Sequence, residues 1–260
     1  MMKPYALLLC MLLLLSACQQ PPAPQQGGEV EARVIEQPEA KPAEPMVTEV
    51  SFKTEDNSEI HGTLYDVPQA KEAVILFHML GKDRHSWDDF AQALQAEGLK
   101  VLALDLRGHG ASTKRGNYEI FYDTMSLGEY QKMVFDAKAA KNFLKEHGLK
   151  FHLVGASIGA NIALTYAAQD SEIQSIVLLS PGEEYRGVRT FEANEKYKGR
   201  ILFVVSEDDA YSYPSTTALS QRAGGPHLLK TYPDAGHGSD MLKSRPELTK
   251  LIIDWLKEAY

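Results

Sequence analysis

Five short, almost wholly apolar runs are spread through the middle of the chain. They lie at residues 73–77, 101–104, 151–154, 175–179 and 201–205, and amphipathic segments lie between most of them. Runs of this length and composition are typical of parallel strands that are covered on both faces. Strands and helices that alternate at this spacing predict an α/β fold with a mostly parallel, doubly wound sheet and helices on both faces.

Amphipathic patterns predict where the main helices begin and end. One continuous helix is expected from Leu127 to His147-Gly148, where the glycine can adopt the left-handed cap conformation. A second should begin at an N-cap on Ser86 and end at Gly98, and a third should begin near Pro246 and run towards the C-terminus. The apolar stripes of these helices are interpreted as core packing.

The N-terminus has the pattern of a bacterial export signal. Lys3 supplies a positive charge, residues 7–15 are almost uninterruptedly apolar, and Leu15-Ser16-Ala17-Cys18 follows. The apolar stretch is too short for an ordinary membrane-spanning helix. The last four residues resemble the lipobox of bacterial lipoproteins, which implies a signal peptide over 1–17 and a lipidated Cys18 that anchors the chain to a membrane. An ordinary secretory signal with a cysteine near its cleavage site is the alternative interpretation.

The segment that follows is expected to be a tether. Residues 18–46 consist largely of Pro, Gln, Glu and Ala, which bury too little apolar surface to offset chain entropy. A single folded domain is predicted over 47–260, and its residues 47–52 and 60–65 alternate in polarity like an antiparallel hairpin. By resemblance to lipoproteins, Gln19 after the cysteine favours the outer membrane of a Gram-negative cell envelope.

The overall charge excludes one class of function. Acidic residues outnumber basic ones by 35 to 27, which gives a net charge of -8 and no basic face for nucleic acid. With signal cleavage, Cys10 would be removed and no internal disulfide could form. The histidines lack the spacing of metal ligands, so we expect neither a metal nor another cofactor.

The segment Gly155-Ala156-Ser157-Ile158-Gly159 predicts a nucleophile. It follows the apolar run 151–154 directly and opens a helical pattern, which is the context that a Gly-x-Ser-x-Gly motif requires. A serine hydroxyl needs a base to remove its proton, and that base needs an acid to orient it. His237 lies in a glycine-flanked loop near the end of the chain, and it is the expected base.

The expected acid lies just after the apolar run 201–205. Three acidic residues, Glu207, Asp208 and Asp209, compete for this role, so the chain order is serine, acid, histidine. Taken together, these segments resemble the α/β-hydrolase superfamily, and most closely its esterase-like or dienelactone-hydrolase-like members. The resemblance implies Asp209 as the acid, with Asp208 second, and an α/β-hydrolase fold. A serine at 157, where true dienelactone hydrolases have cysteine, argues against their substrate.

The resemblance also implies an oxyanion hole made of two backbone N–H groups. One belongs to Ile158, the residue after the nucleophile. The other belongs to the loop His78-Met79-Leu80-Gly81, which resembles the His-Gly-x element of the superfamily and favours Leu80, with Met79 as its rival.

Two further segments resemble the superfamily without predicting chemistry. The loop from Asp105 to Ser112 matches its Asp-x-Arg-Gly-x-Gly-x-Ser pattern, and glycines with a buried Arg and Asp pair can fix such a loop, so His109 is not the expected base. Only residues 180–200 separate two predicted strands where many relatives insert a lid, which excludes a large lid domain.

The predicted function is hydrolysis of a carboxylic ester of small or medium size through an acyl-enzyme on Ser157. Peptidase, amidase or thioesterase activity on the same fold is the first alternative. A lipid-anchored binding protein that kept the scaffold without catalysis is the second. The sequence does not identify the substrate or the oligomeric state.

Overall fold

The computed structural model describes residues 46–145 and 148–258. The predicted signal peptide, Cys18 and nearly all of the predicted tether therefore lie outside the described residues. Met46, which was expected to end the tether, is instead the first residue of strand β1.

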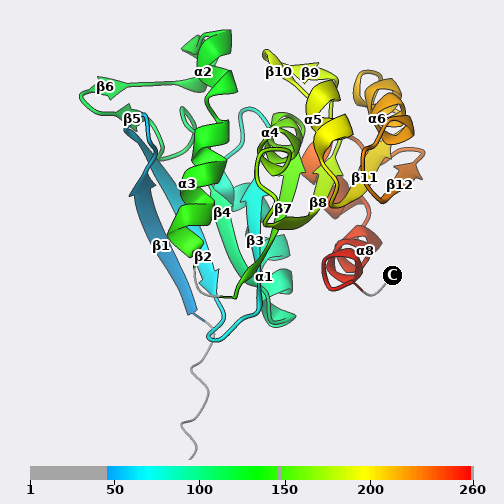
Figure 1. Cartoon of the computed structure of the whole chain (residues 1–260), viewed down its shortest axis with the longest axis horizontal. Helices are drawn as coiled ribbons and strands as arrows, with labels where there is room; N and C mark the ends of the chain where they lie inside the picture. The colour runs from blue at the N-terminus through cyan, green and yellow to red at the C-terminus, as the bar shows by residue number, and fades with distance from the viewer. Residues whose placement is uncertain (1–45, 146–147, 259–260) are drawn as a thin grey trace, which may run out of the picture. The chain divides into compact units, whose positions relative to one another are not determined.

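The chain forms the following elements in order, and Figure 1 labels most of them. The strands are β1 (Met46–Lys53), β2 (Ser58–Asp66), β3 (Glu72–Phe77), β4 (Lys100–Leu104), β5 (Lys114–Arg115), β6 (Tyr118–Glu119), β7 (Lys150–Ala156), β8 (Ile173–Leu179), β9 (Glu184–Tyr185), β10 (Val188–Arg189), β11 (Arg200–Ser206) and β12 (His227–Tyr232). The helices are η1 (Arg84–Trp87), α1 (Asp88–Ala96), η2 (Tyr122–Thr124), α2 (Leu127–Gln131), α3 (Val134–Leu144), α4 (Ile158–Ala167), α5 (Phe191–Lys196), α6 (Ser212–Gln221), η3 (Gly238–Asp240), α7 (Met241–Ser244) and α8 (Glu247–Leu256).

One mixed sheet organises the domain. Its strands follow the order β12-β11-β8-β7-β3-β4-β2-β5-β6, and β1 pairs with β2. The six strands from β12 to β4 are parallel, whereas β1, β2, β5 and β6 join through antiparallel pairs. The five apolar runs thus form five adjacent parallel strands, and the predicted N-terminal hairpin is β1 with β2. The fold confirms the predicted mostly parallel sheet.

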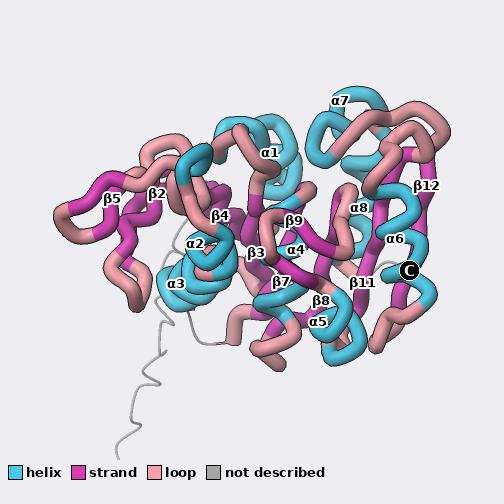
Figure 2. Tube along the Cα trace, turned by 90° about the horizontal axis from the view of Figure 1, so that it is seen from above, coloured by secondary structure: helices cyan, strands magenta, loops and turns pink. Residues whose placement is uncertain are grey.

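Helices cover both faces of this sheet because its parallel strands are apolar on both sides. Within β3, Ile75 and Phe77 pack in the core cluster that includes α3 and α4, whereas Val74 and Leu76 pack in the cluster that includes α1 and α8. Figures 1 and 2 show α3 and α4 on one side of the strands and α1 on the other. Side chains that alternate in this way bury both faces of each central strand.

Two helix predictions need correction. The expected single helix from Leu127 is two helices, α2 and α3, because the chain makes tight turns at Lys132 and Met133, whose N–H groups bond three residues back. Ser86 does not cap a helix. It lies inside the 3₁₀ turn η1, which Asp83 caps, and α1 continues directly from that turn. The C-terminal helix α8 lies where the sequence predicts it.

The parallel strands all end at the same edge of the sheet, and this positions the candidate site. Ser157 follows β7, Asp209 follows β11 and His237 follows β12. Met46 lies at the opposite edge, because β2 pairs antiparallel with both β1 and β4, so β1 runs in the same direction as β4 and begins at the same edge of the sheet as that strand. In place of a large lid, residues 180–200 form the small β9–β10 hairpin and α5.

Candidate active site

Ser157 occupies the tight turn between β7 and α4. Its φ is 55° and its ψ is -120°, a conformation that costs a non-glycine residue roughly 1–3 kcal/mol. A Cβ atom at Gly155 would lie 2.3 Å from the carbonyl oxygen of Gly159, and a Cβ at Gly159 would lie 2.2 Å from that of Phe77. The turn is therefore possible only because both flanking positions are glycine.

Backbone hydrogen bonds hold this turn against the sheet and start the following helix. The N–H of Ser157 donates to the carbonyl of Leu179 at 2.8 Å, and the Ser157 carbonyl accepts from Ala160 and Asn161. Ile158 is the first residue of α4, where an N–H group has no partner within the helix. The N–H of Ile158 is therefore chemically suited to bind an oxyanion at the side chain of the preceding serine.

The structure brings Asp209 and His237 into direct contact. Asp209 Oδ2 lies 2.6 Å from His237 Nδ1, and its other oxygen accepts from the N–H of Ser212 at 3.1 Å. Burial by itself would raise the pKa of Asp209, but hydrogen bonds from Ser212 and His237 outweigh it and lower that pKa. The carboxylate therefore stays ionised and can stabilise an imidazolium.

The other two acids after β11 do not contact this imidazole. Asp208 accepts a 3.3 Å hydrogen bond from the N–H of Gly236, and Glu207 bonds the carbonyl of Tyr232 through its own N–H. Both side chains are exposed. Only Asp209, of the three candidates, has the geometry to orient His237.

Ser212 is part of the same arrangement, and no sequence pattern indicated it. Its Oγ lies 3.4 Å from His237 Nδ1, the nitrogen that also faces Asp209. The side chain is fully buried at the start of α6. We call Asp209, Ser212 and His237 the acid–base cluster.

The loop that carries His237 lies against the turn that carries Ser157. The N–H of Gly238 donates to Ser180 Oγ at 3.0 Å. A Cβ at Gly238 would lie 3.5 Å from the Cβ of Ala156 and 2.7 Å from the sulfur of Met79. The residues that adjoin the predicted base and nucleophile are thus in contact, although no hydrogen bond joins the Ser157 hydroxyl to His237 within the described residues.

His78 holds the predicted oxyanion loop in place. Its Nε2 accepts the N–H of Leu106 at 3.0 Å, so the proton is on Nδ1, which donates to the Met79 carbonyl at 2.9 Å. Complete burial, together with the nearby His109, lowers the pKa of His78 to about 3, so the ring stays neutral. Because a trans peptide points its C=O and N–H in opposite directions, the N–H of Leu80 points away from His78.

The loop after β4 is held by buried charges that we call the Arg107 cluster. It consists of Asp56, Arg84, Asp105, Arg107 and Asp136. Arg107 bonds the carboxylates of Asp136 and Asp56, and its N–H bonds Asp136 as well. Asp105 pairs with Arg84. The fully buried carboxylate that pairs with Arg107 thus belongs to Asp136 on α3, outside the loop from Asp105 to Ser112.

His109 lies in the interior beside this cluster. Its ring stacks on Tyr122 with centroids 4.4 Å apart, and Nδ1 contacts the Arg107 carbonyl at 3.1 Å. The ring is 2% exposed, and burial lowers its pKa. This environment is that of a packed core histidine.

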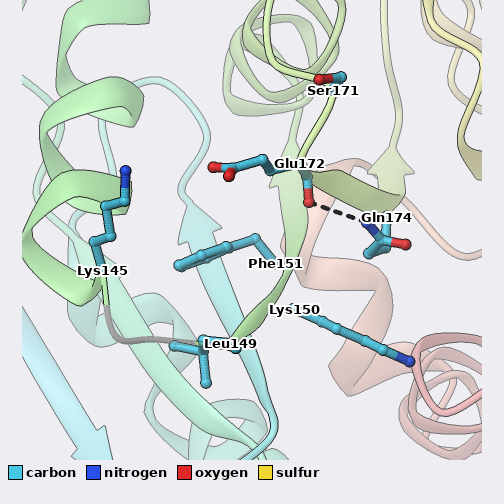
Figure 3. A pocket seen from close by; sticks show the side chains of 8 residues that line it. Lys145, Leu149, Lys150, Phe151, Ser171, Glu172 and Gln174 are labelled. Carbon is cyan, nitrogen blue, oxygen red and sulfur yellow. Dashed lines mark hydrogen bonds between the residues drawn. The ribbon is translucent and has the colours of Figure 1, made fainter. Parts of the chain in front are cut away.

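A surface hollow of about 770 Å³ lies at the other edge of the sheet. Lys145, Lys150, Phe151 and Glu172 are among its lining residues, and Figure 3 shows them around the amino-terminal end of β7. Ser157 follows the opposite end of that strand. This hollow is therefore separate from the candidate active site.

Two features are absent from the described part of the chain. No helix in it is long and apolar enough to cross a membrane. No group of three or more His, Cys, Asp or Glu side chains in it could hold a metal ion.

Comparison with known proteins agrees with this architecture. Residues 72–195 match the family model described as alpha/beta hydrolase fold. An esterase from Pyrococcus furiosus is similar in structure, with a TM-score of 0.67 and 19% identity over 82% of this chain and 91% of the other. A dienelactone hydrolase from Anabaena variabilis has a TM-score of 0.65 and 20% identity, over 82% and 98% of the two chains. The protein has the α/β-hydrolase fold, as predicted.

Sequence relatives match a smaller part. The monoacylglycerol lipase abhd6-A of Xenopus laevis is 28% identical over 137 residues, which are 51% of this chain and 37% of that protein. The probable lysophospholipase BODYGUARD 4 of Arabidopsis thaliana is 31% identical over 121 residues, 45% of this chain and 26% of that protein. The aligned region thus spans about a third of these curated relatives or less.

Proposed function

We propose that this protein is a serine hydrolase that cleaves carboxylic esters of small or medium size through an acyl-enzyme on Ser157. The observation that carries the proposal is the 2.6 Å contact between Asp209 and His237, in a loop that touches the strained turn of Ser157. Acyl transfer requires at least a serine nucleophile and an imidazole base that is held in the right orientation beside it.

The proposed mechanism assigns each group one task. Ser157 Oγ attacks the ester carbonyl carbon while His237 takes its proton, and the N–H groups of Ile158 and Leu80 bind the oxyanion. His237 then gives the proton to the departing alkoxy oxygen. Asp209 keeps the imidazole oriented and balances its positive charge. Water then attacks the carbonyl of the acyl-enzyme while His237 takes a proton from it, and His237 gives that proton to Ser157 Oγ as the bond to the acyl group breaks.

Ester chemistry is favoured by the proteins to which this chain is similar. Those with similar folds include an esterase and an acetyl xylan esterase, and the sequence relatives are named as lipases. Ser212 is the serine that contacts His237 among the described residues, but it lies on the Asp209 side of the ring and in no strained turn. Ser157 is therefore the better nucleophile.

A fluorophosphonate probe tests the assignment directly. We expect it to label the wild-type protein and the Ser212→Ala variant, but not Ser157→Ala, whose turnover of p-nitrophenyl esters should fall at least about 10⁴-fold. Labelling that survives Ser157→Ala would show that the nucleophile is wrong. Faster turnover of peptides or thioesters than of esters would favour the first alternative, and a pure protein without any reactivity would favour a binding role.

We further propose that the enzyme is held in a bacterial cell envelope through lipidated Cys18. The support for this is the lipobox-like segment Leu15-Ser16-Ala17-Cys18 after an apolar stretch. Labelled palmitate should be incorporated into the wild type and not into Cys18→Ala. Incorporation into both would contradict the anchor.

A further inference from the structure

The β9–β10 hairpin is fixed beside the nucleophile by a side chain of α4. Asn161 is fully buried four residues after Ser157. Its Nδ2 donates to the Val188 carbonyl at 2.9 Å, and its Oδ1 accepts from the N–H of Gly182 at 3.0 Å. The segment before β9 and the strand β10 are therefore both tied to the helix that follows Ser157, and Figure 1 shows the hairpin beside α4.

Tyr185 extends from this hairpin towards the acid–base cluster. Its hydroxyl lies 2.8 Å from Ser212 Oγ and 3.4 Å from the carbonyl of Ser180. Its ring centroid is 6.4 Å from that of His237, edge to face. Ser180 follows Leu179, whose carbonyl binds the N–H of Ser157. The hydroxyl of Tyr185 thus lies between Ser180, just after the end of β8, and Ser212, which contacts the predicted base His237.

The phenol keeps its proton. Burial raises the pKa of Tyr185 to about 12, with the charge of Asp209 in the same direction, while hydrogen bonds with Ser212 and Ser157 lower it. An O–H donor is therefore available at every pH at which the enzyme would work.

The sheet order determines which reacting oxygen this donor can serve. The predicted oxyanion loop extends from β3 on one side of β7, whereas Tyr185 extends from the segment after β8 on the other side. His237, from β12, is on the same side as Tyr185. The leaving alkoxy oxygen must face His237, because His237 protonates it.

We propose that Tyr185 is a further catalytic residue, whose hydroxyl donates a hydrogen bond to the alkoxy oxygen of the ester as that oxygen leaves. The ester C–O bond breaks, the alkoxy oxygen takes the proton of His237, and Tyr185 keeps its own. The inference rests on the proposed serine hydrolase function. It predicts that Tyr185 matters most for alcohols that are poor leaving groups.

Two esters with the same acyl group test this. The value of kcat/KM is measured for ethyl butyrate and p-nitrophenyl butyrate with wild type and Tyr185→Phe. Ethoxide needs stabilisation as it leaves and p-nitrophenolate needs little. We expect a loss of about 10- to 100-fold for the ethyl ester and less than about 3-fold for the p-nitrophenyl ester. Fluorophosphonate labelling, in which fluoride leaves, should keep its wild-type rate, which also shows that the variant is folded.

Tyr211→Phe is the matched control. In the wild type, the hydroxyl of Tyr211 donates to the Glu184 carbonyl at 2.7 Å and supports the same hairpin. No hydrogen bond joins this hydroxyl to the acid–base cluster within the described residues. For Tyr211→Phe, the ratio of kcat/KM on ethyl butyrate to kcat/KM on p-nitrophenyl butyrate should equal that of the wild type. An equal loss on both esters in Tyr185→Phe, or no loss on either, would overturn the inference while the wild type remains active. An inactive, unlabelled wild type would instead overturn the proposed function and the inference with it.

Discussion

Two polar clusters lie at the carboxyl edge of the same sheet, and they differ in how far their charges are buried and paired. In the Arg107 cluster the side chains of Arg107 and Asp136 are both 0% exposed, and Arg107 is bonded to two carboxylates. In the acid–base cluster the His237 side chain is 40% exposed. Both clusters combine acids with bases and have histidines within or beside them. A saturated, buried network fixes a loop, whereas one with an open side can exchange protons with a substrate.

The largest expected effect is on the rate of ester hydrolysis, and it distinguishes the two neighbouring aspartates after β11. Asp209→Asn should lower kcat for ester hydrolysis about 10⁴-fold, since the amide no longer stabilises the imidazolium and favours the wrong tautomer. Asp208→Asn should lower it less than about 3-fold, because the side chain of Asp208 hydrogen-bonds only the Gly236 N–H among the described residues. Steady-state kinetics on p-nitrophenyl esters measures both. The reverse ranking would move the acid to Asp208.

A smaller effect is expected on stability in the Arg107 cluster. Arg107→Met leaves the fully buried Asp136 without its partner, which should cost about 3–5 kcal/mol in the free energy of unfolding. Urea denaturation measures this, and the folded fraction should still react with the fluorophosphonate. Lys138→Met is the control, because Lys138 and Glu55 join the same helix to the same turn at the surface. It should cost about 0–1 kcal/mol, and equal costs would contradict the contrast.

The smallest effect is a pH dependence that arises from His78. Its pKa is about 3 in the folded protein and about 6.5 in the unfolded chain, so the unfolded state binds more protons between these values. The contribution of His78 to the free energy of unfolding is therefore fully present above about pH 6.5, and it is lost as the pH falls towards 3. The expected contribution is a loss of about 2 kcal/mol between pH 8 and pH 5. His78→Gln should flatten this slope in urea denaturation, whereas the exposed His227→Gln should not.

The sequence was sufficient for the parts of the fold that depend on local composition. A short run such as 73–77 is apolar throughout because both of its faces are covered, and this is visible without coordinates. The tight turn at Ser157 was equally predictable, because it requires glycine where a Cβ atom would clash with nearby backbone atoms. The break between α2 and α3 was not, because the apolar helical period continues across it. Tyr130 in α2 and Ala137 in α3 pack in the same core cluster.

Side chains that converge from distant segments were the least predictable part of the site. Arg107 meets Asp136 from α3, 29 residues further along the chain. Tyr185 and Ser212 meet across 27 residues. Tyr185 lies in the segment 180–200, for which the sequence predicted only that no large lid is present. Its local sequence signal is Gly187, in a turn where Arg186 and Gly187 both adopt positive φ in the structure. Such contacts depend on tertiary packing, which no local pattern encodes.

The position of Met46, at the sheet edge opposite Ser157, has a consequence for which molecules could meet the enzyme. Cys18 lies 28 residues before Met46, so a lipid attached there could be at most roughly 100 Å from the domain by covalent geometry. An anchor attached through the N-terminus would then join the domain at the edge opposite Ser157, and the point of attachment would not block substrates from the catalytic edge.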